Sequence, residues 1–314
     1  MKALVTGGAG FIGSNLVALL LAERHEVVVL DDISSGYEEN LVADAAFVRG
    51  DVTDRDAVLA AMSGCDVVFH LAASVGNTRS IDDPVRDSQI NVIGTLNVLE
   101  CARAHGIDRV VLSSSAGIFG ELKTLPIRED HPQDPDSPYG VSKLAAEKMC
   151  LVYNRLYGMS NVCLRYFNVY GIRQRYDAYG NVIPIFAERM LRGTEIVIFG
   201  DGEQTRDFVN VTDVARANYL AGTTEGVRGV FNLGSATRVT INELVRVMSE
   251  LSSIDPRVVR SDPRPGDVRD SLAAIDAASA AFGFRPSVEL REGLGIYLEW
   301  LRTDPVTLAR WSST

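Results

Sequence analysis

The chain has 314 residues and carries a formal net charge of −10 at neutral pH. This length predicts about two domains with a substantial buried core, so size imposes no need for disulfide or metal staples. A surface that binds nucleic acid must neutralise phosphates with clustered Lys and Arg, and the negative net charge of the chain argues against such a surface. We therefore expect a globular protein with no nucleic-acid partner.

The four cysteines are widely scattered, with no CxxC pair and no grouping with histidines of the kind that metal ligation needs. We expect no metal site, and we expect Cys65, Cys101, Cys150 and Cys163 to be reduced core residues. The first residues lack the charged, apolar and small-residue regions of a signal peptide, and no apolar stretch is long enough for a membrane span. A cytoplasmic protein without a membrane partner is predicted.

Short β-branched runs alternate with helical segments through the first half of the chain. The runs are KALVT, EVVVLD, AFVRGD, DVVFHLA and RVVLSSS, which is the βαβ rhythm of a parallel sheet. Apolar residues at helical spacing predict two long helices, over 84–105 and 138–157. The pattern indicates an α/β protein with a Rossmann-type, doubly wound parallel sheet.

Beyond NVCLRYFNVYG the rhythm loosens into Gly- and Asp-rich segments typical of ligand loops. We therefore divide the chain into a first domain of residues 1–166 and a smaller α/β domain of residues 167–314. A segment near 205–235 is expected to return to the first domain, because VFNLGS has the character of a sheet strand.

A glycine-rich turn follows the first predicted strand. Gly7, Gly10 and Gly13 stand in VTGGAGFIG, where the strand must turn tightly into a helix that begins at Phe11 and Ile12. Side chains at the glycine positions would keep the backbone amides away from a pyrophosphate. A glycine trio alone is weak evidence, because glycine turns are common.

The next strand strengthens the dinucleotide interpretation. It ends in Asp31, eighteen residues beyond Gly13, where a carboxylate would accept both hydroxyls of the adenosine ribose and repel a 2′-phosphate. NAD is therefore favoured over NADP, although Asp32 could share this role. Asp51 and Val52 would bracket the adenine. The turn HLAA would bring three residues to the pyrophosphate and nicotinamide ribose: Leu71, Ala72 and Ala73. By itself, HLAA is equally well explained as a buried strand followed by a turn.

A second pattern supplies candidate catalytic groups. Tyr139 and Lys143 stand four residues apart in SPYGVSK, which places both side chains on one helix face. A phenol has an ordinary pKa near 10, so a phenolate base needs nearby positive charge, which Lys143 and an oxidised nicotinamide would supply. Ser115, at the end of RVVLSSS, would hydrogen-bond the phenol and a substrate hydroxyl, with Ser113 and Ser114 as neighbours. By itself YxxxK would be interpreted as a pair of exposed helix residues. The serines at the end of the strand and the cofactor pattern favour the catalytic interpretation.

In these segments the chain resembles the extended short-chain dehydrogenase/reductase family and, within it, the UDP-sugar 4-epimerases. The resemblance implies an NAD-binding Rossmann domain in residues 1–166 and a substrate-binding domain in residues 167–314. The matching segments follow the family order over nearly the whole chain: TGGAGFIGSNL, LDDISSG, GDVTD, HLAASVGNTRSIDDP, NVIGTLNVLE, SSSAGIFGE, SPYGVSKLAAE, RYFNVYG, IFGDGEQTRDFVNVTDVA and RPGDVR.

Carried over by position, the resemblance implies further site residues. Ser35, Gly36, Ser113 and Tyr166 would contact the cofactor, and Asn91 would support the helix beside it. Other residues would hold the UDP part of the substrate, with two arginines clamping the diphosphate through their forked donors. This set is Asn168, Asn181, Val182, Val197, Ile198, Phe199, Arg206, Arg264 and Asp267.

The implied reaction is C4 epimerisation of a UDP-hexose through a transient 4-keto sugar, with Tyr139 exchanging the O4 proton while NAD exchanges the C4 hydride. A 4,6-dehydratase usually carries Asp-Glu directly after the strand-end Ser or Thr, whereas Ala116 and Gly117 follow Ser115 here. A non-catalytic NAD-sensing protein typically lacks the tyrosine or the lysine, and this chain has both.

Two positions bear on the choice of sugar. Ser271 falls, by its offset from Arg264 and Asp267, where a bulky residue would restrict the pocket to simple hexoses, so it leaves room for an N-acetyl group unless it is merely exposed. The resemblance thus implies UDP-GlcNAc/UDP-GalNAc, UDP-Glc/UDP-Gal, or both. Arg175 resembles the arginine of uronic-acid epimerases and would bind a C6 carboxylate, which makes UDP-glucuronate the third alternative.

The two long predicted helices resemble those that form a four-helix dimer interface in related enzymes. The resemblance therefore implies a homodimer.

Overall fold

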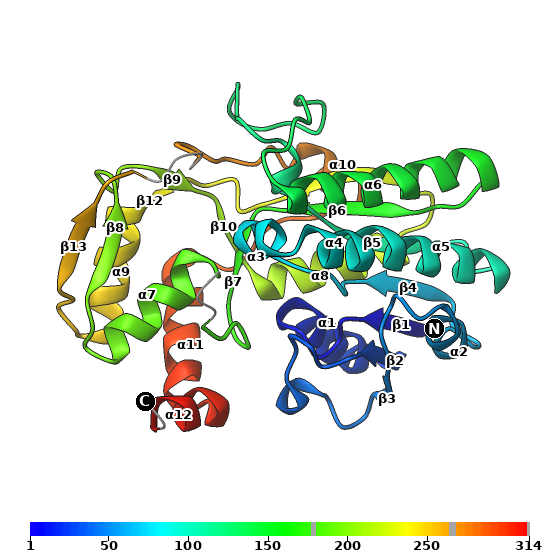
Figure 1. Cartoon of the computed structure of the whole chain (residues 1–314), viewed down its shortest axis with the longest axis horizontal. Coiled ribbons are helices and arrows are strands. Elements are labelled where there is room, and N and C mark those ends of the chain that lie inside the picture. The colour runs from blue at the N-terminus through cyan, green and yellow to red at the C-terminus, as the bar shows by residue number, and fades with distance from the viewer. Residues whose placement is uncertain (177–179, 264–267, 313–314) are drawn as a thin grey trace.

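The computed structural model describes residues 1–176, 180–263 and 268–312 (Figure 1). A seven-stranded parallel sheet forms the centre of the larger part, and three two-stranded sheets lie outside it. The predicted α/β class with a Rossmann-type sheet and a smaller α/β region is confirmed.

The strands of the main sheet run in the order β11-β6-β5-β4-β1-β2-β3. The order reverses between β1 and β4, and ligands of such sheets bind outside the carboxyl ends of the strands at this point. The strands are β1 (Lys2–Thr6), β2 (Glu26–Asp31), β3 (Ala46–Arg49), β4 (Val67–His70), β5 (Val110–Ser115), β6 (Val162–Tyr166) and β11 (Gly229–Leu233).

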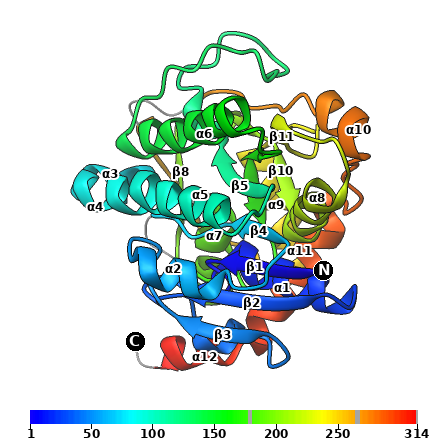
Figure 2. The same cartoon turned by 90° about the vertical axis from the view of Figure 1, so that its right-hand side faces the viewer.

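Helices cover both faces of this sheet, because its central strands are apolar on both sides. In β1, Ala3 and Val5 pack against one helical layer and Leu4 packs against the other. The first layer is α1 (Phe11–Ala22), α8 (Val211–Thr223) and α10 (Asp276–Phe282); the second is α2 (Arg55–Ala61), α5 (Gly94–Ala104) and α6 (Pro138–Tyr157). Figure 2 shows the sheet between α5 and α6 on one side and α8 and α10 on the other.

The two long predicted helices are present. The helix α6 has the predicted bounds, Pro138–Tyr157. The other is interrupted, because a π-helical turn at Gln89–Ile93 separates α4 (Pro84–Ser88) from α5. Asn91 within that turn exchanges hydrogen bonds with the backbone of Ser74 at 2.9 and 3.0 Å, which ties the turn to the loop after β4. A short helix, α3 (Asn77–Asp82), lies in the same layer.

The smaller lobe packs around its own apolar core, which includes Ile183, Phe186, Leu244 and Leu298. Between the lobes, β7 (Asn168–Tyr170) pairs with β10 (Phe208–Asn210), and the chain then returns to the main sheet through α8 and β11. The elements of the lobe are α7 (Val182–Leu191), β8 (Ile196–Phe199), β9 (Thr205–Arg206), β12 (Val239–Thr240), α9 (Ile241–Ser252), β13 (Val258–Ser261), α11 (Leu290–Thr303) and α12 (Pro305–Ser312).

All four cysteines are buried with free thiols. Within the described ranges, no three His, Cys, Asp or Glu side chains come together in a way that would hold a metal ion. Over the same ranges, every helix is too short or too polar to cross a membrane.

A buried ion pair joins α6 to the main sheet. Glu147 of α6 accepts hydrogen bonds from Arg165 of β6 at 2.7 and 2.9 Å and from the Ser114 hydroxyl of β5 at 2.8 Å. The two charged side chains are 0% and 1% exposed. A satisfied buried pair adds little net stability, but removing one partner leaves the other charge unpaired in the interior.

We therefore expect Glu147→Gln to lower the free energy of unfolding by about 3–5 kcal/mol, because Arg165 loses its counter-charge. Urea denaturation measures this. The matched control is Glu195→Gln, which breaks the exposed 2.8 Å pair with Arg257 and should change stability little. Equal losses in the two variants would contradict the assignment.

Candidate active site

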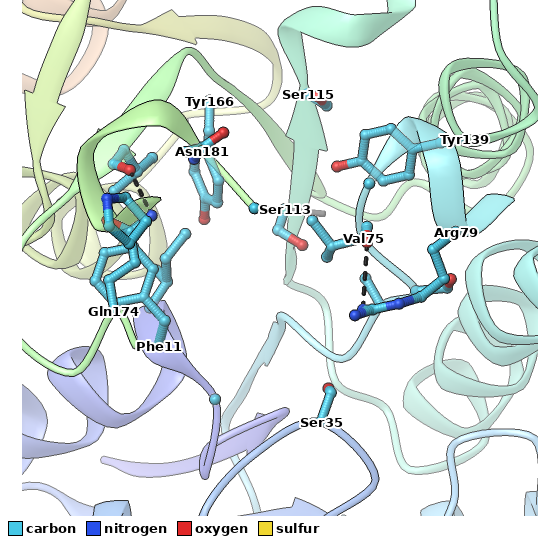
Figure 3. Close-up of a pocket in the computed structure, with 18 of the residues that line it drawn as sticks. Phe11, Ser35, Val75, Arg79, Ser113, Ser115, Tyr139, Tyr166, Gln174 and Asn181 are labelled. Carbon is cyan, nitrogen blue, oxygen red and sulfur yellow. Dashed lines mark hydrogen bonds between the residues drawn. The ribbon is translucent and has the colours of Figure 1, made fainter. Parts of the chain in front are cut away.

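A cleft of about 1560 Å³ lies between the carboxyl ends of the main-sheet strands and the smaller lobe (Figure 3). It gathers predicted residues from both parts of the chain. Those that line it are Gly7, Gly10, Phe11, Ile12, Gly13, Asp31, Asp32, Ser35, Gly36, Asp51, Val52, Leu71, Ala72, Ala73, Ser113, Ser115, Tyr139, Lys143, Tyr166, Asn168, Arg175, Asn181, Val182, Val197, Ile198, Phe199 and Arg206.

The glycine turn has the backbone packing that a dinucleotide cradle requires. A Cβ on Gly13 would lie 2.1 Å from the carbonyl oxygen of Gly7, and one on Gly7 would lie 2.6 Å from the amide nitrogen of Ala72. The following helix α1 has no side-chain cap and no acidic residue in its first turn. Its amides and its dipole are therefore available to a pyrophosphate.

Asp31 stands where the ribose hydroxyls of a bound dinucleotide would be recognised. Its carboxylate is 8% exposed and accepts the amides of Ala9 at 2.9 Å and Ile33 at 2.8 Å. Burial raises the pKa of Asp31, and these two hydrogen bonds only partly offset the effect. Each oxygen keeps a lone pair for a ribose hydroxyl, so these residues fit NAD.

The predicted adenine end of the cleft contains an ion pair that the sequence did not indicate. Asp51 accepts a hydrogen bond from Arg86 of α4 at 2.8 Å, and both residues line the cleft. Burial alone would raise the pKa of Asp51, but the contact with Arg86 and the hydrogen bonds from Thr53 together outweigh burial and lower the pKa. Asp51 therefore lines the cleft as an ionised carboxylate paired with Arg86.

The candidate catalytic groups come from the start of α6 and the end of β5. The Ser137 hydroxyl caps α6 by accepting the Gly140 amide at 3.1 Å, with Pro138 at the first helical position, so Tyr139 projects from the first turn. Figure 3 shows its ring pointing into the cavity near Ser113 and Ser115. The Lys143 ammonium lies 6.0 Å from the centre of that ring.

Lys143 is nearly inaccessible, and its ammonium donates to the Ser113 carbonyl oxygen at 2.9 Å and to the Ser113 hydroxyl at 3.4 Å. Burial lowers the pKa of Lys143 to about 8, which the negative charge of Asp87 on α4 partly opposes. The lysine is thus anchored to the sheet rather than bonded to the phenol.

The sequence predicts that Lys143 and an oxidised nicotinamide together favour the phenolate, and Lys143 alone does not lower the pKa of Tyr139 in this structure. Burial, with a smaller contribution from the charge of Asp87, raises the pKa of Tyr139 to about 12, and the hydrogen bond with the Ser115 side chain offsets only part of this effect. Transferring a phenolate from water into this interior raises its free energy by more than the positive charge of Lys143 at this distance lowers it. The phenol therefore stays protonated near neutral pH until further positive charge enters the site.

Two further residues that the sequence predicts at the cofactor have distinct positions. Tyr166 lines the cleft and donates its hydroxyl to Asn218 at 2.8 Å. Asn91 is not among the residues that line it. Its amide donates to Asp87 at 3.2 Å and to Ser142, one turn from Tyr139, at 3.0 Å.

On the substrate side, Asn168 donates to the carbonyl oxygen of Asp207 at 3.3 Å, and Arg206 donates to that of Thr205 at 2.8 Å. Asn181, Val182 and Val197 to Phe199 come from α7, its N-cap and β8, and they face the same cleft. Arg264 and Asp267 lie outside the described residues. The structure thus brings the described members of the predicted nucleotide set together.

The prediction that Arg175 binds a sugar carboxylate is not supported. Its guanidinium already makes a bidentate contact with Asp304 at 2.7 and 2.9 Å and donates to Asn40 at 2.8 Å. The two paired side chains are only 5% and 3% exposed. A substrate carboxylate would have to displace a buried counter-ion.

Ser271 also departs from its predicted place. It is 7% exposed, so the alternative of a merely exposed serine is wrong, but it is not among the residues that line the cleft. The adjoining backbone is pinned elsewhere, because the Ala273 amide donates to Asp207 and the Leu272 carbonyl oxygen accepts the Ile127 amide. The geometry gives no support for Ser271 as a wall opposite the sugar.

The sequence reasoning missed two glutamines in the cleft wall. The side-chain oxygens of Gln174 and Gln204 are buried and have no hydrogen-bond partner among the described residues, while their amide nitrogens donate to backbone carbonyls at 3.1 and 2.8 Å. It also missed the cations Arg173 and Arg189. Their position depends on how the lobes meet, which no local pattern reveals.

The fold and this cleft define a class of dinucleotide-dependent enzymes that act on nucleotide sugars. The model of the NAD dependent epimerase/dehydratase family matches residues 3–234, and the chain belongs to this family. The resemblance to extended short-chain dehydrogenases/reductases is thereby confirmed, and NAD is the cofactor of the family.

Three solved structures are similar over almost their whole length. The UDP-glucose 4-epimerase of Thermotoga maritima, solved with UDP-glucose, is 40% identical with a TM-score of 0.93, covering 96% of this chain and 99% of that one. The UDP-N-acetylglucosamine 4-epimerase of Methanobrevibacter ruminantium is 35% identical with a TM-score of 0.92, covering 96% and 98%. The UDP-glucose 4-epimerase of Thermus thermophilus, solved with NAD, is 39% identical with a TM-score of 0.89, covering 97% and 100%. These likenesses support an NAD-dependent activity of the UDP-sugar 4-epimerase type.

The glycine turn yields a direct test of the cofactor site. We expect Gly13→Ala to lose NAD binding, because its methyl group would collide with the Gly7 carbonyl oxygen and displace the turn. Gly295→Ala is the matched control, since the added carbon meets only Leu251 at 3.8 Å within another helix. Titration with NAD compares them, and wild-type affinity in Gly13→Ala would refute the cradle.

Proposed function

We propose that the protein inverts the C4 carbon of a UDP-sugar, using NAD as a bound redox cofactor. The observation that carries the proposal is the meeting of Tyr139, Ser115 and Lys143 in the cleft that also holds the glycine turn and Asp31. One cavity thus joins a proton-transferring phenol to a dinucleotide cradle.

In the proposed mechanism, Tyr139 takes the proton of the sugar O4 and later returns it, while Ser115 orients that hydroxyl. NAD, which the glycine turn and Asp31 would hold, would supply the acceptor and donor of the C4 hydride when bound. Lys143, held by Ser113, contributes positive charge that favours the phenolate once the site is filled. The 4-keto sugar must turn over within the cleft before the hydride and proton return.

Dehydration of the sugar is a poorer explanation of the site. It needs a carboxylic acid beside the reacting carbons, whereas Ser115 leads directly into the short turn Ala116–Ile118. The Ser115 hydroxyl accepts the Gly117 amide at 3.0 Å, so the backbone closes this side of the site. The local geometry supports proton and hydride exchange without elimination.

For the sugar, we propose neutral UDP-hexoses, with and without a 2-acetamido group. Arg175, the residue that favoured a uronate, is held by Asp304. Similarly close relatives are named for UDP-glucose and for UDP-N-acetylglucosamine. A coupled assay of UDP-glucose, UDP-N-acetylglucosamine and UDP-glucuronate tests this, and turnover of the uronate at the highest rate would overturn it.

The catalytic assignment predicts that Tyr139→Phe lowers kcat about 10²- to 10⁴-fold, because the O4 proton loses its acceptor. The NAD content of the purified variant should stay at the wild-type level, since the ring is retained. The assay is conversion of UDP-galactose to UDP-glucose, with cofactor measured after denaturation. Undiminished inversion by this variant would remove the basis of the mechanism.

We also propose that the protein forms a homodimer through the helical layer that contains α3 to α6. Large apolar side chains are exposed on these neighbouring helices, which Figure 2 shows side by side. Exposed apolar groups gathered on one face favour a protein contact. They are Ile81, Val85, Ile93, Val141, Leu156 and Tyr157, with exposures between 49% and 67%.

If this face pairs two copies, the double variant Val85→Glu, Leu156→Glu should be monomeric, because four carboxylates would be buried in the interface. Ile296→Glu is the control, since Ile296 is 54% exposed on α11 in the other lobe. Light scattering after size exclusion gives the mass of each. A dimer that survives the double variant would disprove the interface.

A further inference from the structure

Arg175 is the centre of a buried polar cluster that joins three distant segments. Its guanidinium holds Asp304 through two hydrogen bonds of 2.7 and 2.9 Å and donates to the side-chain oxygen of Asn40 at 2.8 Å. The same group lies over the rings of Tyr37 and Trp300, with 4.4 and 5.4 Å to their centres. The guanidinium is thus engaged at its edge and on its faces.

One of these segments contains the loop beside the predicted ribose site. Asn40 donates to the carbonyl oxygen of Ala9, in the glycine turn, at 2.9 Å, and the Tyr37 amide donates to the same oxygen at 3.1 Å. Ala9 in turn donates its amide to Asp31 at 2.9 Å. Residues 35 to 37 line the cleft, so Arg175 is connected through Asn40 to the backbone that would surround the adenosine.

The opposite anchor is the C-terminal helix. Asp304 accepts the amide and the hydroxyl of Thr307 at 2.9 and 2.7 Å, which caps the start of α12. Arg310 of the same helix forms an ion pair with Glu188 of α7 and lies over the ring of Tyr176. Figure 1 shows α12 at the lower edge of the molecule, near the chain that follows β2. The helix is therefore fixed to the smaller lobe.

This arrangement has a consequence for the cofactor. The loop of residues 35–40 cannot move away from the glycine turn without breaking the contact of Asn40 with Arg175, and Arg175 cannot follow it without leaving a buried carboxylate unpaired. A loop held in this way opens rarely. We expect release of a dinucleotide bound beside this loop to be correspondingly slow.

We infer that Arg175 is a positioning residue that fastens the adenosine-side loop to the C-terminal helix and so retains NAD on the protein between turnovers. The inference rests on the proposed function, in which the cofactor is reduced and reoxidised within one cycle and has no need to leave. It gives Arg175 a role on the cofactor side of the cleft in place of contact with the sugar.

The test is the rate at which preloaded, radiolabelled NAD is lost from Arg175→Met in the presence of excess unlabelled NAD. We expect release at least 10-fold faster than from the wild type, with unchanged affinity for UDP. Arg269→Met is the matched control, because it removes a bidentate but exposed pair with Asp201 and should not alter release.

Loss of stability alone is separated by a second control. Leu298→Ala leaves a cavity in the core of the smaller lobe but removes none of the hydrogen-bond or ring partners of Arg175, so it destabilises the fold but should keep NAD release slow. Asn40→Ala removes the connection to the glycine turn and leaves the Arg175–Asp304 pair in place. This variant replaces Arg175→Met in the release assay if Arg175→Met does not fold. Wild-type release from Asn40→Ala or Arg175→Met, or equally fast release from Leu298→Ala, would overturn the inference.

The release assay contains no sugar nucleotide, so its result is independent of the proposed reaction. A protein that inverts no UDP-sugar, yet loses NAD quickly only when Arg175 or Asn40 is changed, would reject the proposed function and keep the retention role. If both hold, added NAD should restore the activity of Arg175→Met, which a general folding defect would not allow.

Discussion

The buried pair of Glu147 and Arg165 is the interaction on which the geometry of the cleft depends. It joins the helix that carries Tyr139 and Lys143 to the two strands that end in Ser115 and Tyr166. Because the Ser114 hydroxyl also donates a hydrogen bond to the Glu147 carboxylate, α6, β5 and β6 are joined at one point. The groups that would handle a proton thus gain fixed relative positions from a contact below the site.

The electrostatics of the site follow from the same burial. The interior raises the pKa of Tyr139 and lowers that of Lys143, so both groups favour their neutral forms more than they would in water. A positively charged nicotinamide ring bound beside them would shift the phenol toward its ionised form. In the proposed mechanism, proton transfer by Tyr139 would therefore depend on the presence of the oxidised cofactor.

An acidic protein that binds an anionic substrate must concentrate its cations. Here Arg173, Arg189 and Arg206 line the cleft, while the chain as a whole carries a net charge of −10. Arg175 lies in the same wall but has its charge balanced by Asp304.

Much of this protein can be derived from its sequence alone. The parallel sheet, the glycine turn, the carboxylate at the end of β2 and the Tyr139–Lys143 spacing depend on backbone geometry over a few residues, which local patterns express directly. The partners of Arg175 cannot be derived from a local pattern, because Asp304 is 129 positions away and Asn40 is 135 positions away in the other direction. The same holds for the burial of Ser271, the π-helical turn at Asn91 and the raised pKa of Tyr139. These features arise where separate elements pack against one another, and only the tertiary structure decides which charges and hydrogen-bonding groups meet there.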